Sequence, residues 1–233
     1  MIKVIKIFTV LCFFAVSVCN GQHLIGINTC FTENKISCDS FGFNKKMYSE
    51  PGYGFGIAYK HMELRNIIGF QCEVNYNYSG FRIEPSDSTY FKQRLKFVHI
   101  PFLAHVDFGQ HAVKFIFAIG PYVDIMVGKS KFETNIQEFD SSGVDRIAFG
   151  KYTTFSYGLA GQAGFAICTN AGVFQITAQG IVGMSKLIKM PDIALLNYVR
   201  RWSAGIGISY YKPFGKEPYF TKKEKIKEAK DKS

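Results

Sequence analysis

Charged and amide side chains recur at alternate positions of several apolar segments, and these are the residues that could do chemistry. The set comprises Gln71, Glu73, Asn75, Lys96, His99, Asp124, Gln175, Gln179 and Arg201, and the same faces carry His105, Asp107, Lys114 and Gln162. Because a buried, unpaired charge costs several kcal/mol, we expect these groups to pair in a polar network that cross-braces the interior of the fold. A proton or ion path gated by His99 is the alternative, since histidine changes charge near neutrality.

Enzymatic and metal sites are harder to build from these residues. His105 and Asp107 form an i, i+2 pair on one face, but two ligands do not make a metal site. His61, His105 and His111 fall at the opposite end from the serines of the longer loops, and His99 lies in mid-strand, so no Ser-His-Asp arrangement is supported. We therefore expect no enzyme, no metal and no cofactor.

Cysteine use fits an oxidising compartment. Cys30 and Cys38 flank the start of a predicted loop and could form a disulfide. Cys72 and Cys168 fall on opposite predicted faces, so pairing between them is not expected. We interpret these two as small apolar fillers.

The elements that must position these groups are β-strands with two unlike faces. In residues 70–78 every even position is apolar or aromatic and every odd position is polar, and a one-residue slip would reverse every side chain. In residues 93–108 the phase changes near Phe97 and Val98, which predicts a bulge. Eight strands are expected, at 24–31, 53–64, 70–78, 93–108, 113–127, 154–168, 174–185 and 201–210.

The connections between these strands alternate strictly between short and long. Tight turns at 65–66, 109–112 and 169–172 alternate with longer connections, of which 32–52 and 129–151 are the longest. Such a meander puts all tight turns and both termini at one end, as in outer-membrane barrels. The sequence therefore predicts an all-β fold, an eight-stranded antiparallel up-and-down transmembrane β-barrel, which we expect to be monomeric.

Side-chain size indicates which face is outside. The interior of an eight-stranded barrel is barely wide enough for side chains, and the polar face is rich in Gly, Ser and Gln whereas the other is rich in Phe, Tyr, Ile and Val. We therefore expect the apolar face to contact outer-membrane lipid and the filled lumen to conduct nothing. A soluble, secreted lipocalin-like binding barrel, with the faces reversed, is the alternative.

The two ends of the chain differ from the predicted barrel at 22–214. Residues 1–21 place Lys3 and Lys6 before a short apolar run, as in a secretory signal peptide. Residues 215–233 form a basic tail, expected in the periplasm. Residues 1–21 and 212–233 together carry +6 of the net charge of +10, so the charge balance does not indicate nucleic-acid binding.

Three segments resemble the PorT-like outer-membrane β-barrel proteins of Bacteroidetes. They are residues 94–104 (RLKFVHIPFLA), 120–123 (GPYV) and 69–76 (GFQCEVNY), in the family's order and spacing. The resemblance implies a cell-envelope barrel and an accessory role in protein secretion or envelope assembly, with envelope proteins as partners. The other hypothesis is a structural or interaction role through the extracellular loops.

Overall fold

The computed structural model describes residues 22–39, 46–63, 67–86, 89–109, 112–130, 133–135, 151–169, 171–189 and 198–214. The predicted signal peptide and basic tail lie outside these residues. The eight long strands are β1 (Gln22–Asp39), β2 (Lys46–Glu63), β3 (Ile68–Ser86), β4 (Thr89–Phe108), β5 (Val113–Lys129), β8 (Phe155–Cys168), β9 (Val173–Gly183) and β11 (Tyr198–Phe214). The short strands are β6 (Glu133–Thr134), β7 (Lys151–Tyr152) and β10 (Ile188–Lys189).

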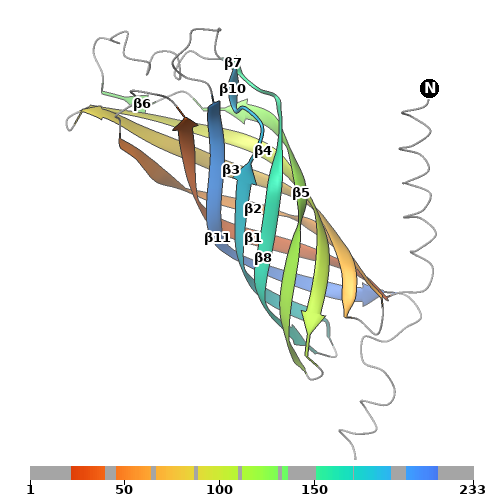
Figure 1. The fold of residues 1–233 in the computed structure, drawn as a ribbon. Coiled ribbons are helices and arrows are strands. Elements are labelled where there is room, and N and C mark those ends of the chain that lie inside the picture. Colours follow the sequence, from red (N-terminus) through yellow and green to blue (C-terminus); the bar gives the residue numbers. More distant parts are fainter. Residues whose placement is uncertain are drawn as a thin grey trace, which may run out of the picture.

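The eight long strands close into a barrel (Figure 1). Each pairs antiparallel with its neighbour in sequence, β1 pairs with β11, and the β3–β4 pairing completes the ring. This confirms the predicted eight-stranded up-and-down barrel. The connections β2–β3, β4–β5 and β8–β9 lie at the end where β1 begins and β11 finishes, which we call the tight-turn end. In the described parts of the chain, no helix is long and apolar enough to span a bilayer.

Large apolar side chains cover the outside of the barrel. Ile27 on β1, Phe117 on β5 and Ile208 on β11 are 64%, 43% and 55% exposed, and each alternates with a side chain that points inward. An outer apolar band is the arrangement that lipid requires. The lipocalin-like alternative is therefore wrong, because it needs this face inside.

The strands are longer than expected at the end opposite the tight turns. A membrane strand needs about 9–11 residues, whereas β3 has 19 and β4 has 20. The predicted loop at 32–52 is mostly strand, since β1 continues to Asp39 and β2 begins at Lys46. Figure 1 shows β3 and β4 projecting past β8 and β9 at this end, beside β6.

The predicted bulge lies on a different strand. β4 keeps one phase, with odd positions from Phe91 to Asp107 pointing inward. The register instead shifts on β5, where Lys96 pairs with Gly128 but Phe97 pairs with Met126. The apparent phase change in the sequence arises because the inward positions of β4 farthest from the tight turns carry large apolar side chains, Phe91, Leu95 and Phe97.

Among the described residues, the interior contains two apolar layers and one smaller apolar cluster, which corrects the expectation of a small and polar lumen. We call the end opposite the tight-turn end the open end. One layer at the open end comprises Ile36, Phe81, Ile83, Phe91, Leu95, Phe97, Tyr152, Leu187 and Ile188. A second at the tight-turn end comprises Leu24, Ala58, Met62, Ile116, Ala166, Cys168, Val173 and Tyr211. A third, smaller cluster, formed by Leu103, Ala118, Tyr122 and Ala160, lies on one wall of the level between them.

Candidate functional site

The first interior site is an ionic trio centred on Asp124. His99 on β4 is the cross-strand neighbour of Asp124 on β5, and its Nδ1 lies 2.6 Å from Asp124 Oδ1. Arg201 reaches across from β11 and donates from Nη2 to Asp124 Oδ2 at 2.6 Å. Asp124 is only 1% exposed, so both of its oxygens are held by cationic or histidine nitrogens within the barrel.

Aromatic rings enclose this trio. The Arg201 guanidinium carbon lies 4.5 Å from the Phe97 ring centroid, and the ring of His99 lies 5.0 Å from that of Tyr122. A cation over an aromatic face gains further electrostatic stabilisation when desolvated. The trio is therefore fixed from the side by packing as well as by its hydrogen bonds.

The second site is a carboxylate held by amides. Glu73 on β3, which is 3% exposed, accepts from Asn28 Nδ2 and Asn75 Nδ2 at 2.7 Å each and from Gln162 Nε2 at 3.0 Å. Gln71 Nε2 donates to it as well. These donors come from β1, β3 and β8, so the Glu73 amide cage, as we call it, links three parts of the wall. Four amide donors solvate the charge in place of a cation.

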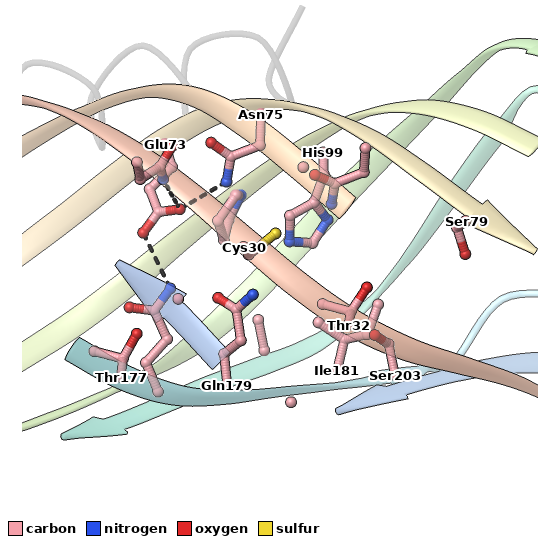
Figure 2. A pocket seen from close by; sticks show the side chains of 18 of the residues that line it. Cys30, Thr32, Glu73, Asn75, Ser79, His99, Thr177, Gln179, Ile181 and Ser203 are labelled. Carbon is pink, nitrogen blue, oxygen red and sulfur yellow. Dashed lines mark hydrogen bonds between the residues drawn. The ribbon is translucent and has the colours of Figure 1, made fainter. Parts of the chain in front are cut away.

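The amide cage borders a small internal cavity of about 40 Å³. Figure 2 shows Glu73 and Asn75 on one side of it, with Thr177 and Gln179 opposite. The Oδ1 atoms of Asn28 and Asn75 accept no hydrogen bond. Gly56 leaves room for the Asn75 side chain, because a Cβ at this position would collide with Asn75 Oδ1. A cavity of this size and polarity suits a few water molecules, not a drug-sized ligand.

A third group lies nearer the tight-turn end. Lys60 Nζ lies 3.0 Å from His105 Nε2, and His105 also contacts the Asp107 carboxylate. Lys60 is 2% exposed and its ammonium lies 4.8 Å from the Tyr211 ring centroid. Sequence reasoning named His105 and Asp107 but missed Lys60, although its even position puts it on the same face as the small residues of β2.

The structure gathers most of the predicted residues in the interior, in separate groups. Gln71, Glu73 and Asn75 form the cage, whereas His99, Asp124 and Arg201 form the trio. Gln179 borders the cavity, and Gln175 is buried at 2% exposure.

Lys96 is the exception, because it does not point into the lumen. Its neighbours Leu95 and Phe97 are buried inside the barrel, so Lys96 lies on the outer face, where its side chain passes over Gly128. The prediction failed because it assumed a phase change in β4.

The proposed disulfide is also wrong. Cys30 and Cys38 both lie on the continuous strand β1, where eight residues at about 3.3 Å each separate their Cα atoms by about 26 Å. A disulfide needs Cα atoms within about 7 Å. Cys30 is a free thiol beside the cavity.

Two further features are candidate sites, namely groups of metal-ligating side chains and the buried phenol of Tyr152. In the part of the chain that the structure describes, no group of three or more His, Cys, Asp or Glu residues is placed to hold a metal ion. At the open end, burial raises the pKa of the Tyr152 phenol well above its usual range.

We expect Glu73→Gln to cost only about 1 kcal/mol of unfolding free energy, about one neutral hydrogen bond. The amide oxygen of the substituted side chain would accept from Gln71 and Gln162. Its amide nitrogen would donate to the Oδ1 atoms of Asn28 and Asn75 once those two side chains rotate, and these oxygens have no other partner. The measurement is urea unfolding in lipid vesicles followed by the fluorescence of Trp202, the single tryptophan. A loss of about 3 kcal/mol or more, the cost of leaving buried polar groups unsatisfied, would show that the cage needs the charge itself.

A closed antiparallel barrel with an apolar outer band and polar groups buried inside defines an outer-membrane β-barrel protein. A family model described as the outer membrane protein beta-barrel domain matches residues 23–188. The chain therefore belongs to this family. No curated protein matches the sequence.

Solved structures of small outer-membrane barrels resemble the chain at low sequence identity. Neisserial surface protein A (NspA) is 16% identical with a TM-score of 0.40, covering 80% of this chain and 96% of that one. Ail of Yersinia pestis, solved with the heparin analogue sucrose octasulfate, is 14% identical with a TM-score of 0.40, covering 82% and 99%. OprG of Pseudomonas aeruginosa is 16% identical with a TM-score of 0.42, covering 82% and 96%.

Proposed function

We propose that this protein is a non-conducting outer-membrane barrel with a structural or interaction role, exerted through its extracellular end. The observation that carries the proposal is the filled interior. Apolar side chains pack inside the barrel near each end, and the ionic trio and the amide cage bridge different strands between them. These packed and hydrogen-bonded side chains favour a barrel that conducts nothing, so the proposal includes neither a pore nor an enzyme.

The end opposite the tight turns is the extracellular end in this proposal, because outer-membrane barrels keep short turns and both termini in the periplasm. At this end the described residues form ordered structure. β7 and β10 pair with each other, and Tyr152, Leu187 and Ile188 pack on the interior faces of β1, β3 and β4. Such a cap, beside the long β3–β4 hairpin, offers a pre-formed surface to a protein partner of the envelope or to another surface.

The closed lumen predicts that the purified barrel gives no steady conductance in planar lipid bilayers. The apolar layer at the open end would have to move for ions to pass. A known porin inserted under the same conditions is the control. Regular ohmic steps from the folded protein, comparable with those of the porin, would contradict the proposal.

An accessory role in secretion or envelope assembly is the second candidate, and it is supported by the PorT-like segments at 69–76, 94–104 and 120–123. Deletion of the gene separates the two. Defective export of secreted proteins supports the secretion role, whereas normal export with loss of a surface-binding property supports the interaction role. Copurification of envelope proteins in mild detergent would identify the partner, and the size of the purified particle would test the expected monomer.

A further inference from the structure

The outer face of the β3–β4 hairpin changes abruptly from apolar to basic. Along β4, Val98, Ile100 and Phe102 face outward, and towards the open end they are followed on the same face by Lys96, Arg94 and Lys92. Arg82 lies beside Lys92 on β3. We call Arg82, Lys92, Arg94 and Lys96 the basic strip.

Only half of the basic strip is neutralised. Arg82 pairs with Glu84 and Lys92 pairs with Glu50, each at 2.6 Å. Among the described residues, no carboxylate forms an ion pair with Arg94 or Lys96, although Glu50 and Glu133 lie close enough to act on Arg94 electrostatically. Glu133 is also the cross-strand neighbour of Lys92, so three carboxylates lie among the four cations of the strip. Arg94 and Lys96, at alternate positions of one strand, are the two cations that form no ion pair with a described residue.

These two cations lie just beyond the edge of the apolar band. Lys96 lies two residues, or about 7 Å along the strand, beyond Val98 at the edge of the apolar band. Tyr78, the cross-strand neighbour of Lys96, supplies the aromatic residue that typically marks a membrane interface. The Arg94 guanidinium carbon lies 5.8 Å from the Tyr78 ring centroid. The guanidinium group is planar and can donate two hydrogen bonds to one phosphate.

We propose that the basic strip binds the phosphate group of a phosphorylated glycolipid in the outer leaflet. Arg94 and Lys96 contact the phosphate, and the acyl chains lie against Val98, Ile100 and Phe102. The inference rests on the orientation given under the proposed function, with the β3–β4 hairpin outside. It does not depend on whether the lumen conducts.

Binding is tested by native mass spectrometry of the folded barrel in detergent, with diphosphorylated lipid A as the probe. A lipid A preparation stripped of both phosphates tests the role of the phosphate, and inorganic pyrophosphate tests whether the anion alone suffices. We expect the diphosphorylated lipid to bind at least tenfold more tightly than either. Equal retention of the dephosphorylated lipid, or equally tight binding of pyrophosphate, would overturn the assignment.

The same titration with the R94Q/K96Q double variant tests the residues. We expect at least a tenfold loss of affinity for the diphosphorylated lipid. The matched control, K35Q/K212Q, removes two exposed lysines elsewhere on the barrel and should bind as the parent protein does. Heat-modifiable gel mobility establishes that each variant is folded. Parent-like binding by R94Q/K96Q, or an equal loss in K35Q/K212Q, would disprove a specific site, and tighter strip-dependent binding of a sulfated polysaccharide would replace the lipid as the ligand.

Discussion

Replacing Asp124 by asparagine is expected to destabilise the barrel by about 3–5 kcal/mol, the usual cost of breaking a buried ion pair from one side. The substitution keeps the shape of the side chain but removes the charge that both His99 and Arg201 contact at 2.6 Å. Arg201 is 6% exposed and cannot convert its donors to acceptors. The expected loss is larger than that for Glu73→Gln, because the amides around Glu73 can rotate to exchange donor for acceptor and a guanidinium cannot.

The measurement is the free energy of unfolding in urea with the barrel in lipid vesicles, followed by Trp202 fluorescence. Glu63→Gln is the control, since it makes the same chemical change at a side chain that is 44% exposed, where water can replace most of what the carboxylate loses. The double variant D124N/R201M should recover most of the loss, because the uncompensated cation is removed with its partner. An effect of Asp124→Asn no larger than that of Glu63→Gln would show that the trio does not brace the barrel.

The second large effect is expected on the outer face. Ile119 is 50% exposed on the outside of β5, near the middle of the run of outward apolar residues from Val113 to Val127. Arginine at this position would place a charge in the hydrocarbon centre, which costs about 2–4 kcal/mol in membrane barrels. The same unfolding measurement gives the value.

Val127→Arg is the matched control for depth. It lies on the same outer face of the same strand and is 53% exposed, but it is close to the open end, where the cost falls to about 0–1 kcal/mol. Equal effects at the two positions would mean that the bilayer does not cross β5 where the apolar band indicates. An effect near zero at both would contradict lipid contact on this face.

Much of the fold could be predicted from the sequence because the two faces of a membrane strand lie in different environments. Lipid on one side and a filled lumen on the other make the alternation in residues 70–78 regular, and a regular alternation fixes the strand and its inward face. The same reasoning failed near Lys96. There the interior is filled by Leu95 and Phe97, so both faces of β4 carry large side chains and the polarity pattern no longer reports which face is inside.

The candidate sites were predictable as a set of inward residues but not as separate groups. Glu73 and Asp124 have the same charge and similar burial, yet one is solvated by amides and the other by His99 and Arg201. This difference depends on which strands are neighbours across the barrel: Arg201 is 77 positions from Asp124, and no local pattern joins them. Lys60 was missed because its strand alternates less regularly between apolar and polar residues.

The sequence by itself determined the number of membrane strands, their antiparallel order and which face meets lipid, because these follow from periodicity and from the lengths of the connections. Only the tertiary structure decided the contents of the lumen, the length of the β3–β4 hairpin and the free state of Cys30. The physical reason is that closure of the barrel brings distant strands together and sets the space between them. Pairing and packing inside are therefore properties of the closed ring, not of any single strand.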